Sequence, residues 1–315
     1  MIDVTYNQII QEALGSFPGN TLDRATPESA VLDLEANERG RDFFAGDVHG
    51  HFGDLERSLD LIGFDSSKDR LICVGDLIDR GPDSERSLEW LRHDWFFSVR
   101  GNHEQMAIES ALDGSLLRIW MLNGGGWADG LPERCLDSLK GQLSVLPYAI
   151  SVKTTCGQTI GVTHAEVPIG LTWQAFCDTL REEALYPERY PVAQLSAIWG
   201  RIRISAIKRD GFERLVRKLE GLGIAPEVTD WLVRQDPAKI TPAPKSGIRV
   251  CAVGHTPVPE FVRHGDVAYL DTGHTWKAGA SQGAALQANT AFPLIDAQEL
   301  LSLEDPPSCS AQEAC

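Results

Sequence analysis

The sequence predicts an α/β fold with a largely parallel sheet, because short apolar segments alternate with helix-like segments from residue 41 onward. Three apolar runs, DFFAGD, LICVGD and FFSVRGN, end in Gly-Asp or Gly-Asn, and the segments DLERSLDLIGF and SERSLEWLRH separate them. The carboxyl ends of parallel strands lie at one edge of a sheet, where ligands gather. Polar residues at the ends of these runs are therefore candidates for a functional site.

Two later segments indicate a second sheet. The segments PYAISVKTTCGQTIGVTH and IRVCAVGHTPVPEFVRHGDVAYLDTG each read as a pair of strands, with turns at Cys156-Gly157 and His264-Gly265. The segment between them is charged and helix-like and ends in a Pro/Lys-rich loop. We therefore expect a helical and loop insertion at about residues 205–247.

The remaining boundaries follow from where the strand pattern starts and stops. We expect residues 1–40 to form an N-terminal extension, residues 41–300 to form the main domain, and residues 301–315 to form a flexible tail. The 315-residue length is compatible with one large domain or two small ones.

Composition and charge exclude several classes of protein. With 43% apolar and 23% charged residues the chain resembles an ordinary globular protein. The 29 basic and 45 acidic residues give a net charge of −16, which repels nucleic acids and anionic membranes. The longest nearly apolar stretch has about half the roughly 20 residues that cross a bilayer, and the N-terminus has no cationic leader. We expect no nucleic-acid partner and no membrane association.

The cysteines indicate a reducing compartment. Seven cysteines occur without CxxC spacing, in a chain large enough to fold without disulfides. We therefore expect reduced thiols and a cytoplasmic location, and we make no prediction of the oligomeric state.

The ends of the three predicted strands carry the motifs GDVHG, GDLIDRG and GNHE. Asp47 and His49 stand two residues apart in an extended chain, so their side chains point the same way and can hold one ion. Asp76 follows after about one β-α repeat, and Asn102 and His103 follow after another. Each motif alone fits a turn or a helix cap, but the order and spacing of all three predict a site for a divalent transition metal.

Two later histidines complete the candidate ligand set. His164, in GVTHAE, and His255, in AVGHTP, each follow an apolar run that reads as a strand. Taken singly, each is more often a core histidine than a ligand. Beside a predicted metal site we interpret both as ligands.

These motifs together resemble the phosphoprotein phosphatase branch of the binuclear metallophosphoesterases, from Asp47 to about Gly273. The phrase VRGNHEQM and the segment Trp199-Gly200-Arg201 are most similar to compact, lambda-type bacterial and phage protein phosphatases. The resemblance implies a calcineurin-like β-sandwich flanked by helices, with the metals at the C-terminal ends of strands. It also implies a serine/threonine protein phosphatase that acts on phosphoproteins or phosphopeptides.

The resemblance further implies how the metal ligands are shared. The first ion would be held by Asp47, His49 and Asp76, and Asp76 would bridge to a second ion held by Asn102, His164 and His255. Two such ions share a bridging water and lower its pKa toward about 7, which gives a hydroxide for direct in-line attack on phosphorus. We expect Mn²⁺ from the resemblance, although mixed oxygen and nitrogen ligands also accept Fe, Zn, Co, Ni or Mg.

The remaining catalytic residues handle the phosphoryl oxygens and the leaving group. Arginine matches phosphoryl oxygens with its fixed fork of donors, and we choose Arg80 and Arg201, with Arg203 as the fallback. The alkoxide that leaves from phosphoserine or phosphothreonine is strongly basic and needs a general acid. By resemblance, His103 is this acid and Asp79 accepts its ring N–H.

Two alternative functions remain open. A symmetric dinucleoside-tetraphosphate hydrolase has the same metal core, but its second motif would resemble GDLVARG, with alanine in place of Asp79. A non-catalytic metal-binding scaffold is disfavoured, because all six ligand positions and the acid pair are filled. We expect the histidines outside the motifs to lie on the surface or beside the site: His51, His93, His264 and His274.

Overall fold

Two β-sheets form the centre of the computed structural model, which describes residues 27–111, 114–186, 191–207, 217, 247–274 and 291–304. The four-stranded sheet has the order β10-β2-β3-β4. Its strands β2 (Asp42–Ala45), β3 (Arg70–Cys73) and β4 (Phe96–Ser98) are parallel, and β10 (Leu294–Asp296) is antiparallel at the edge. The parallel arrangement confirms the strands predicted from the alternating pattern.

The six-stranded sheet has the order β1-β5-β6-β7-β9-β8 and contains both predicted strand pairs. Its strands are β1 (Val31–Leu34), β5 (Ala149–Lys153), β6 (Thr159–Thr163), β7 (Val250–Val253), β8 (Val262–His264) and β9 (Val267–Tyr269). The pairs β5–β6 and β8–β9 are antiparallel. The pairs β1–β5, β6–β7 and β7–β9 are parallel.

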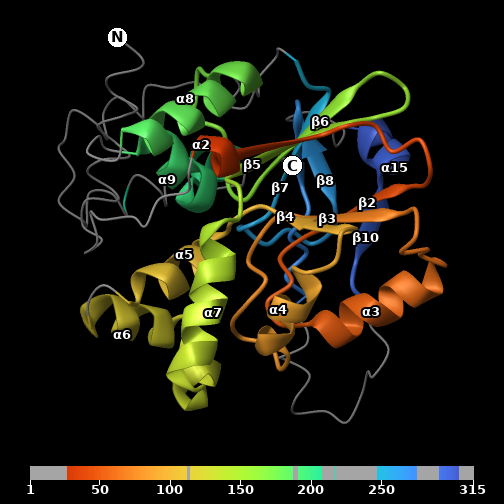
Figure 1. The fold of residues 1–315 in the computed structure, drawn as a ribbon. Helices are drawn as coiled ribbons and strands as arrows, with labels where there is room; N and C mark the ends of the chain where they lie inside the picture. Colours follow the sequence, from red (N-terminus) through yellow and green to blue (C-terminus); the bar gives the residue numbers. More distant parts are fainter. Residues whose placement is uncertain are drawn as a thin grey trace, which may run out of the picture.

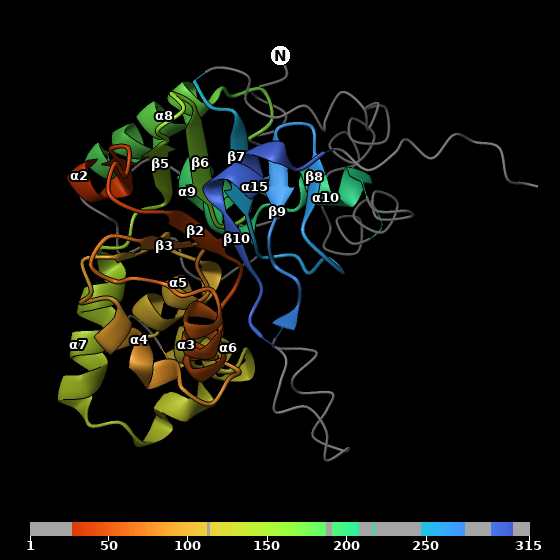
Figure 2. The same cartoon turned by 90° about the vertical axis from the view of Figure 1, so that its right-hand side faces the viewer.

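Helices cover the outer face of each sheet, so the molecule has four layers (Figures 1 and 2). On the four-stranded sheet lie α3 (Phe52–Leu61), η1 (Ser84–Arg86), α4 (Ser87–Trp90), α5 (Asn102–Glu109), α6 (Gly114–Leu122), η2 (Gly125–Gly130) and α7 (Glu133–Ser144). On the six-stranded sheet lie α2 (Pro27–Ala30), α8 (Trp173–Leu185), α9 (Val192–Trp199) and α10 (Ile202–Ile207), while α15 (Ala297–Ser302) follows β10.

Strand alternation explains how the sheets stack. In β3, Ile72 packs between the two sheets against Val162 of β6, whereas its neighbours Leu71 and Cys73 face the helices. In β7, Cys251 likewise faces the helices α8 and α9. Buried strands with apolar residues on both faces are typical of sheets covered on both sides.

Two predicted boundaries need correction. Residues 31–34 were expected in an N-terminal extension, but they form β1 and pair with β5. Residues 301–302, expected in the tail, complete α15. Most of the predicted insertion at 205–247 and of the tail lies outside the described residues.

Two further expectations concern membranes and cysteines. Within the described ranges, no helix combines the length and hydropathy that a membrane span requires. Five cysteines of these ranges are free thiols: Cys73, Cys135, Cys156, Cys177 and Cys251.

Candidate metal centre

The loops after β2, β3 and β7 have an unusual backbone. In the described part of the chain, every non-glycine residue with a positive φ belongs to the predicted site: His49 (44°), Asp76 (47°), Asp79 (75°), Arg80 (68°) and His255 (66°). Such conformations cost about 1–3 kcal/mol each and persist only where the surroundings enforce them. They turn the side chains at the strand ends toward one another.

Glu104 holds two of these loops together. Its carboxylate accepts hydrogen bonds from the backbone N–H groups of Asp76 (2.9 Å), Leu77 (2.8 Å) and Gly101 (2.8 Å). Burial, together with the charge of Asp76, raises the pKa of Glu104 to about 7. Glu104, the last residue of the GNHE motif, was not predicted as a site residue, although a carboxylate in the first turn of a helix is a signal for such a role.

His49 and Asp76 form the first group of ligands. The Nδ1 atom of His49 lies 3.0 Å from the carbonyl oxygen of Ile78 and donates to it, so the Nε2 lone pair faces the site. This Nε2 lies 3.6 Å from Oδ2 of Asp76. The third donor atom within 4.8 Å of these two belongs to His103. The predicted ligand Asp47 is not a member of this group; it is buried and accepts the backbone N–H of His255 at 3.1 Å.

His164, His255 and Asn102 form the second group, again around Asp76. His164 Nδ1 donates to the carbonyl oxygen of Val74 at 2.8 Å, which leaves a lone pair on its Nε2. That lone pair faces Oδ1 of Asn102 at 3.0 Å and Oδ1 of Asp76 at 3.4 Å. His255 Nδ1 lies 3.1 Å from the same Nε2. Three acceptor atoms therefore converge: Nε2 of His164, Oδ1 of Asn102 and Oδ1 of Asp76. A cation between them would compensate their negative partial charges.

The spacing and charge of these groups fit divalent metal ions. Ligand atoms at 2.0–2.1 Å from a tetrahedral ion are about 3.3 Å apart, close to the two distances from Asp76 to His49 and His164. Burial and the charges of Asp271 and Asp76 raise the pKa of Asp47, which marks a local excess of negative charge. Burial alone would raise the pKa of Asp76, but the surrounding imidazoles, His164 foremost, hold it below its usual value. Burial also lowers the pKa of His49, which keeps this imidazole neutral and able to bind metal.

Two arginines reach the open side of this cluster. Arg80 places Nη1 2.6 Å from Nε2 of His49 and Nη2 2.8 Å from Nε2 of His103. Arg201 donates from Nε to Nε2 of His255 at 2.8 Å. Both predicted arginines therefore lie against the candidate ligands.

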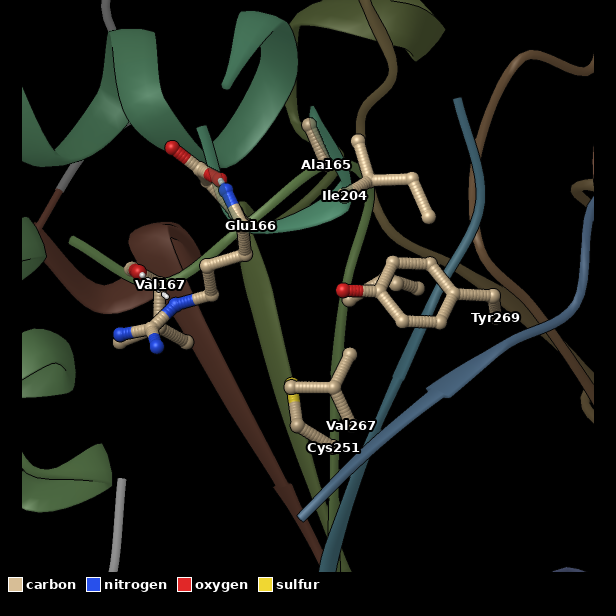
Figure 3. Close-up of a pocket in the computed structure, with 9 residues that line it drawn as sticks. Ala165, Glu166, Val167, Ile204, Cys251, Val267 and Tyr269 are labelled. Atoms are coloured by element: carbon tan, nitrogen blue, oxygen red, sulfur yellow. Dashed lines mark hydrogen bonds between the residues drawn. The ribbon is translucent and has the colours of Figure 1, made fainter. Parts of the chain in front are cut away.

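The fallback residue, Arg203, lies elsewhere. Its side chain is buried, and its Nε donates to the carbonyl oxygen of Val167 at 3.1 Å. Its backbone N–H donates to Glu166, which also lines the small pocket of Figure 3 with Cys251 and Tyr269. The pocket has a volume of about 10 Å³, which holds at most one water molecule. Arg203 is therefore placed for packing rather than for binding an oxyanion.

Asp79 and His103 form a buried pair beside the ligands. Oδ2 of Asp79 accepts the Nδ1–H of His103 at 2.6 Å, so Nε2 of His103 faces the centre. The indole N–H groups of Trp120 and Trp127 also donate to this carboxylate, at 3.0 and 2.7 Å. Trp120 was not predicted as a site residue, because it lies 41 residues from Asp79 in the sequence and no local motif joins the two.

Comparison with known proteins agrees with this geometry. A family model described as calcineurin-like phosphoesterase matches residues 43–275. This chain belongs to the calcineurin-like phosphoesterase family. It is therefore a metallophosphoesterase, and the fold expected from the resemblance is confirmed.

Relatives cover the chain to different extents. Serine/threonine-protein phosphatase 1 of Salmonella typhimurium is 30% identical over 251 residues, which are 78% of this chain and 93% of that protein. Serine/threonine-protein phosphatase 2 of Escherichia coli is 34% identical over 45% of this chain and 66% of that protein. A symmetrical bis(5'-nucleosyl)-tetraphosphatase of Aromatoleum aromaticum is 42% identical, but over only 22% of this chain and 26% of that protein.

Proposed function

We propose that this metallophosphoesterase is a serine/threonine protein phosphatase acting on phosphoproteins or phosphopeptides. The observation that carries the proposal is the buried Asp79–His103 pair beside the ligand cluster, because phosphoserine and phosphothreonine leave as strongly basic alkoxides. The relative aligned over most of its length, from Salmonella typhimurium, is named as such a phosphatase. The alignment with the tetraphosphatase of Aromatoleum aromaticum covers about a quarter of either chain.

We assign two metal ions to the ligand cluster. Asp47, His49 and Asp76 would hold the first, and Asp76, Asn102, His164 and His255 would hold the second. When bound, two divalent ions supply Lewis acidity and lower the pKa of water toward neutrality. We propose Mn²⁺ as the ion, and the mixed oxygen and nitrogen donors also accept Fe, Zn, Co, Ni or Mg.

Arg80 and Arg201 are assigned to the phosphoryl group. Two N–H donors of Arg80 point into the centre side by side, toward His49 and His103, and this fork matches two oxygens of a phosphoryl group. Arg201 approaches from the side of His255. Together they neutralise charge on the oxyanion as the phosphorus changes configuration.

His103 is assigned as the general acid. With Nδ1–H held by Asp79, Nε2 of His103 faces the centre, where it accepts a hydrogen bond from Arg80 in this structure. In the catalytic form, Nε2 would carry the proton and Arg80 would turn its donors to the phosphoryl oxygens. As water attacks phosphorus, the bond to the serine or threonine oxygen breaks, and that oxygen takes the Nε2 proton. Two indole N–H groups and Nδ1–H of His103 donate to Asp79 and fix the orientation of its side chain.

Turnover on two substrates tests the proposed specificity. Chelator-treated protein reloaded with Mn²⁺ is assayed side by side on a phosphothreonine peptide and on diadenosine tetraphosphate, at equal metal content. We expect preference for the peptide. Preference for the dinucleotide would replace the protein-phosphatase assignment by the tetraphosphatase one, and activity on neither would favour a non-catalytic scaffold.

We also propose a cytoplasmic location. The support is the chemistry of the cysteines, since the five in the described ranges are free thiols rather than disulfides. Mass spectrometry of protein from native cells, alkylated before lysis, should find these thiols reduced; disulfides among them would contradict the location.

A further inference from the structure

A second group of metal-ligating side chains lies near the candidate metal centre and shares no ligand with it. His51, Asp54 and His274 place one donor atom each within 4.8 Å of one another. We expected His51 and His274 on the surface or beside the site, but their side chains are only 11% and 6% exposed. Neither has a role in the proposed hydrolysis.

Both imidazoles aim at one carboxylate oxygen. Nδ1 of His51 lies 3.1 Å from Oδ2 of Asp54, and Nε2 of His274 lies 2.9 Å from the same atom. Two imidazole nitrogens and one carboxylate oxygen are a common ligand set for Zn²⁺ and neighbouring divalent ions.

Neighbouring side chains hold the three ligands in place. Arg57 donates to Oδ1 of Asp54, which leaves Oδ2 for the imidazoles. The ring of Phe292 packs against His274 at a centroid distance of 5.0 Å, and the His51 and His274 rings meet edge to face at 5.2 Å. Partners that orient a ligand from outside are a regular feature of metal sites.

We propose that His51, Asp54 and His274 form a third metal site, for a zinc-class divalent ion. On binding, the ion takes the place of the protons between Asp54 and the two imidazole nitrogens, and each neutral imidazole keeps one proton on its other ring nitrogen. Around a tetrahedral ion, each of these nitrogens lies about 3.3 Å from Oδ2 of Asp54, a few tenths of an ångström more than the 3.1 and 2.9 Å in this structure. Three protein ligands leave the remaining position to water.

The ion would join two segments far apart in the sequence. His51 and Asp54 stand at the start of α3, directly after the GDVHG motif, whereas His274 lies 220 residues after Asp54. The segment of His274 also contains Asp271, whose charge acts on Asp47. The bound ion would therefore hold together the start of α3, which follows Asp47 in the sequence, and the segment of His274. It would take no part in the chemical step.

Metal counting tests this proposal independently of activity. Stripped protein is titrated with Co²⁺, and the bound metal per chain is measured after gel filtration, together with the visible absorption of the Co²⁺ protein. We expect His274→Gln to bind one ion fewer than the unmutated chain. The matched control is His93→Gln, since His93 is exposed and stacks on Trp95 away from the cluster; it should bind the full number.

A second variant guards against misfolding. Asp54→Asn has the same shape, and it too should bind one ion fewer while keeping the circular dichroism spectrum of the unmutated chain. Equal metal content in all four proteins would overturn the third site, even if turnover were as proposed. Conversely, loss of one ion in both cluster variants would support the site even if no substrate were turned over.

Discussion

Asp79 connects the proposed general acid to the helical layer. Its carboxylate receives the imidazole of His103 and the indole N–H groups of Trp120 and Trp127, and it is fully buried. Three donors fix the orientation of this buried side chain. The orientation of the His103 ring therefore depends on Trp120 of α6 and Trp127 of η2, which hold Asp79 in place.

Replacing one indole tests this dependence. Trp127→Phe removes the 2.7 Å hydrogen bond to Asp79 and keeps an aromatic ring. We expect kcat to fall by about tenfold, the equivalent of one hydrogen bond to a charged group, with unchanged metal content. Trp95→Phe, on the far side of the α3–α4 layer, is the control and should leave kcat unchanged; equal effects would mean that the indole acts only through packing.

Asp47 is expected to be essential for metal binding. Asp47→Asn keeps an oxygen that accepts the N–H of His255 but removes the charge that burial already disfavours. We expect at least one ion fewer per chain by elemental analysis, and activity at background. Asp60→Asn, an exposed carboxylate on α3, should bind metal normally. Full metal content in Asp47→Asn would contradict the ligand assignment.

Single residues in the site were predictable because the chemistry lies in short motifs at strand ends. The motifs were sufficient to predict that His49, Asp76 and the Asp79–His103 pair lie together, whereas the roles given to these residues stay predictions. They were not sufficient for residues whose partners come from distant segments. Trp120 reaches Asp79 across 41 residues and His274 reaches Asp54 across 220, and no local pattern encodes those contacts.

At the scale of elements, close packing at strand ends requires glycine. A Cβ on Gly254, just after β7, would lie 2.0 Å from Oδ1 of Asp47, whereas a Cβ on Gly141 of α7 would meet nothing within 4 Å. Gly254→Ala should therefore displace Asp47 and lower metal content and kcat by at least tenfold. Gly141→Ala should stabilise α7 by about 1 kcal/mol and leave activity intact. Calorimetry with metal analysis checks both, and a fully active Gly254→Ala would contradict the packing.

Glu109, at the end of α5, makes stability depend on pH. Burial raises its pKa from 4.5 to about 7, although Gln105 donates to its carboxylate. The folded state therefore keeps the proton between those pH values while the unfolded state loses it, so stability falls as pH rises through this window. Glu109→Gln should be more stable than the unmutated chain at pH 8, by on the order of 2 kcal/mol, and similar at pH 4.5. Urea unfolding at both pH values checks this, and an equal difference at both would contradict it.

Elements with local patterns were predicted well, and elements defined by long-range pairing were not. The parallel strands β2, β3 and β4 and the antiparallel pair β5–β6 follow from apolar runs and turn residues. Strand β1 was missed because its four residues, VLDL, are ambiguous alone and pair with β5 more than a hundred residues later. Whether so short a segment forms a strand depends on the neighbouring strand with which it pairs.

At the scale of the whole molecule, metal ions should couple function to stability. The proposed ligands follow β2, β3, β4, β6 and β7, so ions that bind only the folded chain would stabilise both sheets together. At a free metal concentration one hundred times the Kd, binding at one site stabilises the folded chain by about 2.7 kcal/mol. Chelation should therefore lower the melting temperature and abolish turnover, and Mn²⁺ should restore both. An unchanged melting temperature would contradict this coupling.

The most direct test of the account compares leaving groups in His103→Asn. The unmutated chain and the variant, matched for metal content, are assayed for kcat/KM on a phosphothreonine peptide and on p-nitrophenyl phosphate, whose nitrophenolate leaves without a proton. We predict a loss of about 10²–10⁴ on the peptide and little loss on the aryl ester, because only the alkoxide needs the acid. Equal losses on both substrates, or none on the peptide, would contradict the assignment of His103 and the proposed serine/threonine phosphatase chemistry.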